Sequence, residues 1–161
     1  LLSVEGWAFR DCTALKAIKL PQSVAAVKKG AFWGCSALEE FVLPDAVNML
    51  DQGVLANCTS LKSVSLHEGV LSIGYGAFYN CSAIECITLP AAVVNVGDQA
   101  FRSCKSLKEL HVLCDAAPMC SADIADADVY ARTMLLVPTG KVGEYGFARI
   151  WDRFGNVEEI V

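Results

Sequence analysis

Apolar residues recur along the chain with a fixed period of 23 residues. Four uninterrupted units cover residues 8–30, 31–53, 54–76 and 77–99, and a fifth, diverging unit begins at Ala100. Seven positions of the unit are apolar in nearly every copy; in the first copy they are Phe9, Cys12, Leu15, Ile18, Leu20, Val24 and Val27. One short unit cannot bury such a face alone, so the pattern predicts stacked repeats that cover one another.

The middle of each unit alternates between apolar and polar positions. In ALKAIKLP, this period of two directs Ile18 and Leu20 inward and Ala17 and Lys19 outward, as in a short strand. Stacking five such strands predicts a parallel sheet with a strand spacing of about 4.8 Å. A proline follows the strand in the first, second and fourth units, where no ladder donor is needed.

The second half of each unit predicts a shorter extended piece followed by a turn. SVAAV places Val24 and Val27 inward, and AFxxC is long enough for one helical or 3₁₀ turn. Between them stands a glycine column, Gly30, Gly53 and Gly76. Trp7 and Gln99 replace glycine in this column, so a positive φ is not expected at every copy.

The spacing LxxIxLPxxVxxVxxGAFxxCxx resembles the BspA-like, or type-5, leucine-rich repeat, over residues 1 to about 112. The third unit departs from it, with His67 in place of proline and Val54-Leu55 in place of Ala-Phe. The resemblance implies an α/β, β-rich leucine-rich-repeat solenoid. It further implies a surface protein of Bacteroidetes, located on the cell surface or secreted, with host matrix proteins, other bacteria or glycans as partners.

The two ends of the chain differ from the repeats. Leu1 and Val4 fall in the columns of Val24 and Val27, so the chain opens inside a repeat. Because an uncapped solenoid end exposes core, we expect further repeats or a cap before Leu1. The resemblance also extends to the tail, whose VPxG, tyrosine and WxxF elements imply a C-terminal closing segment that ends naturally near Val161.

The 23-residue period is lost after Val112, which divides the domain into repeats (1–112) and a linker with a capping segment (113–161). Within the tail, the sequence predicts a strand up to Pro138 and a short helix near 142–148. Large apolar residues then recur at roughly helical spacing: Trp151, Phe154, Val157 and Ile160. This spacing favours a lid over the last repeat.

Composition excludes several classes of partner. The 161 residues are 54% hydrophobic, yet no apolar run approaches the ~20 residues that a bilayer-spanning helix needs, and membrane insertion of this segment is not expected. The net charge of −5 argues against nucleic-acid binding, which usually requires a basic surface. Residues 1–10 lack the basic start and apolar stretch of a signal peptide.

Five of the eight cysteines occupy one core column: Cys12, Cys35, Cys58, Cys81 and Cys104. Cysteine at such a position acts as a small buried hydrophobe. Parallel in-register stacking seldom gives the Cβ directions that a disulfide needs. The sequence therefore predicts a ladder of reduced, buried cysteines, whereas Cys114 and Cys120 either pair with each other or remain free.

No metal or cofactor is expected. His111, Cys114 and Cys120 are possible ligands, but a fourth ligand at a recognised spacing is missing. The segment DIADAD, residues 123–128, lacks the turn glycine and closing glutamate of a calcium loop. We interpret it as a solvated acidic loop.

The sequence offers little support for catalysis. Cys86 and His111 face outward on adjacent predicted strands, about 7–8 Å apart on a diagonal, which is beyond hydrogen-bond reach. Glu109 shares the strand of His111 but is not obviously placed to orient the imidazole. We therefore expect no catalytic residues, and the chain is not predicted to be an enzyme.

Two exposed columns are candidates for binding. Lys16, Glu39, Lys62, Glu85 and Lys108 alternate in sign, which favours a register-keeping ladder over a ligand site. The other column contains the aromatic and arginine residues that usually anchor interfaces, and its candidate binding residues are Arg10, Trp33, Tyr79 and Arg102. The remaining outward positions of the strands are mostly small and uncharged.

These observations favour a non-enzymatic binding or adhesion module that recognises a protein or glycan through a repeat-built surface. A structural spacer that holds another domain away from the cell is the alternative. A cysteine- or metal-dependent enzyme that uses Cys86 or the region from His111 to Cys120 is a third hypothesis.

Overall fold

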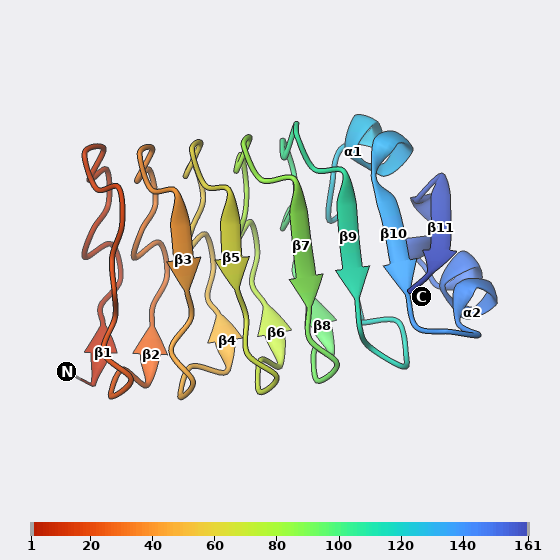
Figure 1. Cartoon of the computed structure of the whole chain (residues 1–161), viewed down its shortest axis with the longest axis horizontal. Helices are drawn as coiled ribbons and strands as arrows, with labels where there is room; N and C mark the ends of the chain where they lie inside the picture. Colours follow the sequence, from red (N-terminus) through yellow and green to blue (C-terminus); the bar gives the residue numbers. More distant parts are fainter. Residues whose placement is uncertain (1, 161) are drawn as a thin grey trace.

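The computed structural model describes residues 2–160 and shows an elongated solenoid of about 7 turns, with the chain ends at opposite ends of the stack (Figure 1). Leu1, which the sequence places in the Val24 column, lies outside the described residues. The fold is the predicted leucine-rich-repeat solenoid with parallel strands.

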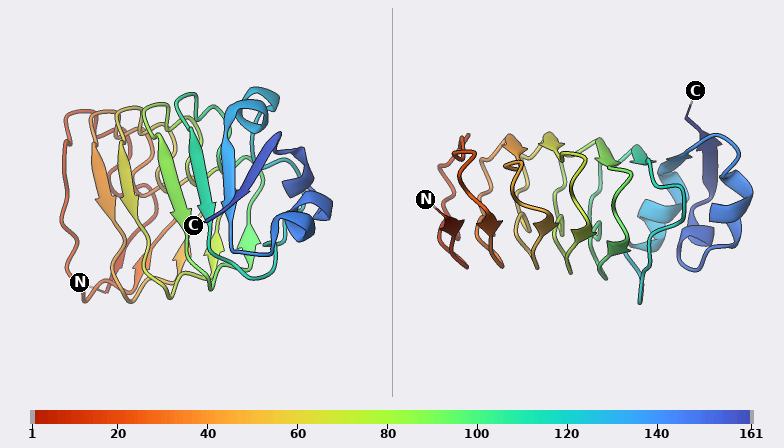
Figure 2. Two further views of the ribbon diagram at one scale, coloured as in Figure 1. Left: turned by 45° about the vertical axis from the view of Figure 1, so that its right-hand side comes forward. Right: turned by 90° about the horizontal axis from the view of Figure 1, so that it is seen from below.

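From the second unit on, each turn contributes strands to two faces of the solenoid, which Figure 2 shows from two further directions. One face carries two-residue strands: β1 (Ser3–Val4), β2 (Ala26–Val27), β4 (Met49–Leu50), β6 (Ser72–Ile73) and β8 (Asn95–Val96). The other face carries β3 (Glu40–Val42), β5 (Ser63–Ser65), β7 (Cys86–Leu89) and β9 (Glu109–Val112). The pairs among these nine strands are parallel and in register at the 23-residue period, as in Phe41 opposite Val64.

The predicted five-stranded sheet is wrong in two respects. The first unit has no strand at residues 15–20, although the Lys16 carbonyl accepts a hydrogen bond from the Glu39 amide (3.0 Å). The longer strands also divide into two hydrogen-bonded groups, β3-β5 and β7-β9-β10-β11. The last two strands, β10 (Met134–Val137) and β11 (Asn156–Glu159), come from the tail and continue the stack beyond residue 112.

The core runs along the axis between the two strand faces. The residues of the Phe9 column are fully buried in the later units, and Phe78 stacks on Phe101 with 5.8 Å between ring centroids. Several core residues of the first unit are only partly buried, since repeats pack on one side of them: Phe9, Leu15, Ile18 and Leu20. Val64 and Leu66 of the third unit are also partly buried.

The cysteine column forms the predicted ladder from the second unit onward. Each thiol donates a hydrogen bond to the carbonyl 26 residues earlier, as from Cys58 Sγ to Phe32 O (3.2 Å) and from Cys104 Sγ to Phe78 O (3.1 Å). The eight cysteines are free, so Cys114 and Cys120 do not pair. Cys12 departs from the expectation because it lies in the first turn and is exposed.

Burial within the ladder gives a prediction about pH. Burial raises the pKa of the Cys58 and Cys104 thiols from 9.0 to about 12. The unfolded chain releases these protons above pH 9, whereas the folded chain retains them. Stability should therefore fall between about pH 9 and pH 12, and urea denaturation across this range measures the loss.

The same ladder predicts a pattern of alkylation. Native protein treated with iodoacetamide at neutral pH should be labelled at the exposed Cys12 and Cys86 and protected at Cys35, Cys58, Cys81 and Cys104, as measured by peptide mass spectrometry. The denatured protein provides the fully labelled control. Equal labelling of Cys81 and Cys12 in the native protein would contradict the ladder.

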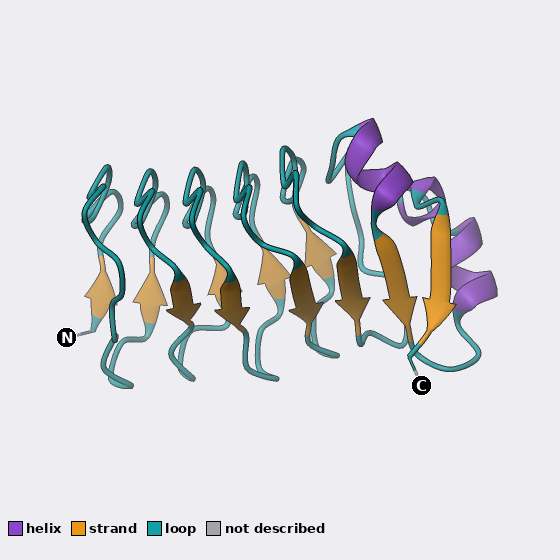
Figure 3. Cartoon of the chain, turned by 45° about the horizontal axis from the view of Figure 1, so that its top comes forward, coloured by secondary structure: helices purple, strands orange, loops and turns teal. Residues whose placement is uncertain are grey.

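Among residues 2–160, helices occur only at the C-terminal end of the stack (Figure 3). α1 (Ala127–Arg132) was not predicted and begins after Asp126, whereas α2 (Val142–Phe147) matches the predicted helix. A 3₁₀ turn, Trp151–Arg153, follows. Trp151 is fully buried, and its indole donates a hydrogen bond to the Pro118 carbonyl (2.7 Å).

The helical spacing expected for the end of the tail is wrong. Trp151 and Phe154 are buried as expected, but residues 156–159 form β11 along the edge of β10. Strand pairing satisfies the backbone groups that β10 would otherwise present at an open edge. The half-buried Val157 therefore lies opposite Leu135 in the sheet.

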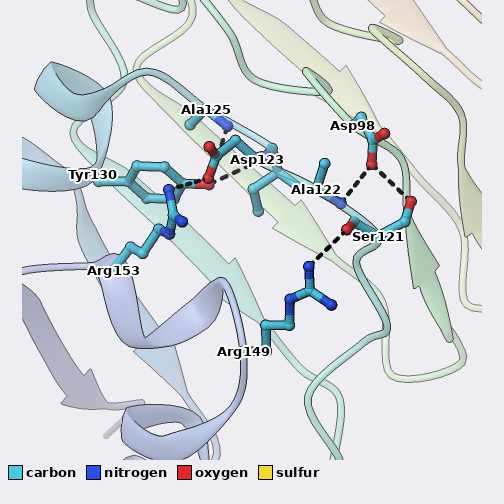
Figure 4. A network of polar contacts seen from close by, with 9 residues as sticks. Asp98, Ser121, Ala122, Asp123, Ala125, Tyr130, Arg149 and Arg153 are labelled. Atoms are coloured by element: carbon cyan, nitrogen blue, oxygen red, sulfur yellow. Dashed lines mark hydrogen bonds and ion pairs between the residues drawn. The ribbon is translucent and has the colours of Figure 1, made fainter.

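The acidic segment 123–128 is not simply a solvated loop. Asp123 pairs with Arg153 of the closing segment, and Tyr130 Oη accepts hydrogen bonds from the amides of Ile124 (3.0 Å) and Ala125 (3.3 Å) (Figure 4). Asp126 accepts a hydrogen bond from the Ser103 amide (2.7 Å). These carboxylates join the last repeat to the tail.

Candidate binding groove

The glycine column forms the floor of a groove along the turns. Gly30, Gly53 and Gly76 adopt φ of +60°, +59° and +56°, the left-handed region that glycine enters without steric cost. Trp7 (φ 62°) and Gln99 (φ 60°) adopt the same conformation, so the doubt about a positive φ at these positions was wrong. The hydrogen bonds between stacked turns hold this position in the left-handed conformation even where it is not glycine, so the backbone of Trp7 and Gln99 is strained.

The groove has a volume of about 440 Å³ and is lined by three columns of the repeat. The glycine column contributes Gly53 and Gly76, with Trp7 and Gln99 where it departs from glycine. The column directly before it contributes Lys29, Gln52 and Tyr75, and the predicted anchor column contributes Trp33 and Tyr79. Large side chains thus surround positions that have no side chain.

Missing Cβ atoms make room for the tryptophan rings. A Cβ on Gly30 would lie 2.1 Å from the Trp7 ring, and one on Gly53 would lie 2.9 Å from the Trp33 ring. The two rings meet edge to face with centroids 5.8 Å apart. Each indole therefore rests on the glycine of the next turn, and an alanine at either glycine would displace it.

Two of the four predicted binding residues line the groove, and two do not. Trp33 and Tyr79 are half-buried in its wall. Arg10 instead stacks over the Trp7 ring at 5.2 Å and pairs with Asp11 (3.2 Å). Arg102 pairs with Asp126 (3.2 Å) and lines a neighbouring hollow.

Sequence reasoning missed several lining residues: Trp7, Lys29, Gln52, Tyr75 and Gln99. Trp7 and Gln99 were visible as departures from the glycine column. What the sequence did not reveal is that this column faces outward, between two columns of larger side chains. Trp7 is 40% exposed and Tyr75 is 46% exposed, so both present ring surface to solvent.

The neighbouring hollow, of about 460 Å³, shares Tyr75 and Gln99 with the groove. Its polar groups are largely engaged with the chain itself. Asp98 accepts hydrogen bonds from Ser121 Oγ (2.8 Å) and the Ala122 amide (2.9 Å), and Arg149 donates to the Ser121 carbonyl (3.3 Å) (Figure 4). These hydrogen bonds therefore hold the last repeats and the closing segment together.

The alternating charge column lies on the other strand face and is paired within itself. Lys62 contacts Glu39 (2.7 Å) and Lys108 contacts Glu85 (2.8 Å), each lysine reaching back by one repeat. Lys62 also lowers the pKa of Glu39 through this hydrogen bond. Because the groups are exposed and screened by solvent, the pairs favour register far more than stability.

The structure corrects the geometry expected for the outward cysteine and histidine. The donor atoms of Cys86, Glu109 and His111 lie within 4.8 Å of one another, closer than the predicted diagonal. Glu109 Oε2 lies 2.9 Å from His111 Nε2, so a carboxylate does contact the imidazole. Partial burial and the charge of Glu109 raise the pKa of the Cys86 thiol, which disfavours a thiolate nucleophile.

The structure does not bring the donor atoms of His111, Cys114 and Cys120 together as a metal site. Cys114 is buried, with its thiol donating to the carbonyls of Pro90 (3.3 Å) and Val93 (3.2 Å). The Cys120 thiol donates to the Pro118 carbonyl (3.6 Å), and His111 contacts Glu109.

Within residues 2–160, no helix combines the length and apolar character needed to cross a membrane.

Comparison with protein families identifies the repeat. The model of the BspA type leucine rich repeat region matches residues 1–108 in 6 copies. The chain belongs to this family. The BspA-type repeats thus account for the 23-residue period, the glycine turns and the cysteine ladder.

Solved structures of other leucine-rich-repeat proteins share this fold. A leucine-rich cell surface protein from Faecalibacterium prausnitzii matches with a TM-score of 0.70 and 21% identity, covering 86% of this chain and 45% of that protein. A leucine-rich repeat protein from Bacteroides ovatus matches with a TM-score of 0.68 and 21% identity, covering 100% of this chain and 46% of that one.

The pneumococcal vaccine antigen PcpA matches with a TM-score of 0.63 and 16% identity, covering 91% of this chain and 41% of the antigen. This BspA-type chain therefore spans less than half the length of each of these three proteins. A search of curated proteins gave no significant match.

Proposed function

We propose that this BspA-type chain is a non-enzymatic binding or adhesion module that holds a protein or glycan ligand in the aromatic groove. The observation that carries the proposal is the groove itself, in which Trp7, Trp33, Tyr75 and Tyr79 surround a floor of glycines. Large rigid rings supply contact area at a small cost in conformational entropy, which is why tryptophan and tyrosine dominate binding hot spots.

The polar residues of the groove complement the rings. Gln52 and Gln99 each provide an amide that donates and accepts hydrogen bonds, and Lys29 adds a positive charge near the Trp7 ring (5.9 Å from Nζ to the centroid). Mostly aromatic walls with a few polar groups are the usual composition of a binding site. The described residues present no comparable aromatic surface on the strand face, whose outward positions are mostly small or charged.

The family supports a place on the cell surface or in secretion. One structural relative is a cell surface protein and another is a vaccine antigen. We extend that setting to this chain as part of the proposal. A protein or glycan partner outside the cell would then meet the turns of the solenoid.

The test is a screen of the native chain against a glycan array and against extracellular matrix proteins, followed by titration of the hits. Trp33→Ala and Tyr79→Ala should each weaken binding by about 30-fold or more, since loss of a central anchor costs at least ~2 kcal/mol. Ser65→Ala and Thr88→Ala, on the strand face, are the controls and should bind as the parent does.

The outcomes separate the alternatives. Loss of binding only in the Ser65 and Thr88 variants would move the site to the strand sheet. A chain that binds none of the probes would favour the structural spacer. Melting curves of all four variants show whether a loss of binding comes from unfolding. We expect all four to stay folded, because Trp33 and Tyr79 are only half-buried.

A further inference from the structure

We propose that Cys86, Glu109 and His111 form a site for a thiophilic divalent transition-metal ion, with Zn²⁺ as the best-fitting occupant. The three residues lie on the outward face of the longer strands, away from the aromatic groove on the turns. Their donor atoms, a thiol sulfur, a carboxylate oxygen and an imidazole nitrogen, all lie within 4.8 Å of one another.

The positions follow from the register of two adjacent strands. Cys86 on β7 stands directly opposite Glu109 on β9, and His111 lies two residues further along β9 on the same face. β7 and β9 are held in a four-stranded parallel sheet, so the three Cα positions are fixed by main-chain hydrogen bonds. Sites supported by strands hold their ligands more firmly than sites on loops.

The distances need only a small adjustment. Zinc bonds sulfur at about 2.3 Å and nitrogen or oxygen at about 2.0–2.2 Å, so tetrahedral donors lie about 3.3–3.8 Å apart. The Glu109 Oε2–His111 Nε2 pair, at 2.9 Å, must open by about 0.4 Å and exchange its hydrogen bond for the ion. The other donor pairs, at 4.8 Å or less, must close by up to about 1–1.5 Å through side-chain movement. Cys86 and Glu109 are exposed and the His111 side chain is 28% exposed, so none is locked by packing.

The donor chemistry selects the ion. Thiolate and imidazole prefer zinc and its neighbours, whereas Ca²⁺ and Mg²⁺ require oxygen ligands. A thiolate and a carboxylate together carry two negative charges, which a divalent cation neutralises. Binding would release the Cys86 proton. The half-buried Met134 of β10, which lies opposite Glu109, would border the site.

Three protein ligands leave the fourth position of a tetrahedral ion open to solvent. An ion at this place would therefore present a free coordination site on the strand face. A carboxylate or imidazole from a partner molecule could complete it, which would give the solenoid a second contact surface independent of the groove.

The experiment titrates the full chain with Co²⁺ and Zn²⁺ alone, in reducing, chelator-free buffer. Co²⁺ should give the near-ultraviolet absorption of thiolate-to-cobalt charge transfer at one ion per chain, and Zn²⁺ should displace it. Calorimetry with Zn²⁺ should show binding that weakens in Cys86→Ser and in His111→Gln by at least the roughly 10–100-fold that loss of an outer-shell partner costs, because each variant removes a direct ligand. Ca²⁺ should not compete.

Matched controls test the assignment to this cluster. Cys12→Ser removes the other exposed thiol, and Glu85→Gln removes an exposed carboxylate from the neighbouring column. Both should bind Co²⁺ and Zn²⁺ as the parent does. A charge-transfer band that survives Cys86→Ser, or Zn²⁺ affinity unchanged in His111→Gln, would overturn the proposal, as would the absence of any thiolate band in the folded parent chain.

Discussion

Trp151→Ala should lower the free energy of unfolding by about 3–5 kcal/mol, the range measured for removal of a large buried aromatic side chain. The Trp151 side chain is fully buried, meets Tyr145 edge to face at 5.7 Å and stacks near Phe154 at 6.0 Å. Its loss would also leave the Pro118 carbonyl without its indole donor. Urea denaturation followed by circular dichroism measures the change.

Phe147→Ala is the matched control for this experiment. Phe147 belongs to the same closing segment and is 92% exposed, so its truncation should change stability by roughly 0.5 kcal/mol or less. Equal losses in the two variants would mean that the closing segment does not pack on the last repeat. A large loss in Trp151→Ala alone supports the segment as a cap that protects the end of the core.

Leu61→Ala should destabilise the chain by about 2–5 kcal/mol. Leu61 is fully buried in the middle of the stack, with complete repeats on both sides. The packed neighbours can therefore fill the cavity left by the substitution only in part. Thermal and urea denaturation of the variant, compared with the parent, measure the effect.

Ser65→Ala provides the comparison for Leu61→Ala. Ser65 is on the outward face of β5, only four residues away, and its truncation should move stability by roughly 0.5 kcal/mol or less. Similar losses for the two variants would contradict the inward and outward assignment of the strand. Because both residues belong to one repeat, differences between repeats do not affect the comparison.

The candidate groove was predictable only in part. Trp33 and Tyr79 stood out as aromatic residues in one exposed column, and both line the groove. Arg10 and Arg102 share that column but are held by neighbouring carboxylates, which are not repeated in the sequence pattern. Periodicity indicates which positions align along the solenoid. It does not indicate which aligned side chains are already paired.

The cluster of Cys86, Glu109 and His111 illustrates a limit of estimates made from backbone spacing. A diagonal between strands separates Cβ atoms by about 7–8 Å, but long side chains that lean toward each other cover much of that distance. The structure brings the three donor atoms within 4.8 Å. Rotamers, rather than register, decide whether such residues meet.

The solenoid, its 23-residue turn, the inward columns and the cysteine ladder all follow from the amino-acid pattern, because each of them repeats and every copy reinforces the same period. Features that occur once depend instead on how distant segments pack. β11 became a strand because the edge of β10 was available for pairing, and Trp7 took a left-handed φ because the turns beside it required one. Local pattern specifies what neighbouring repeats share, whereas the ends and the groove depend on contacts between unlike segments.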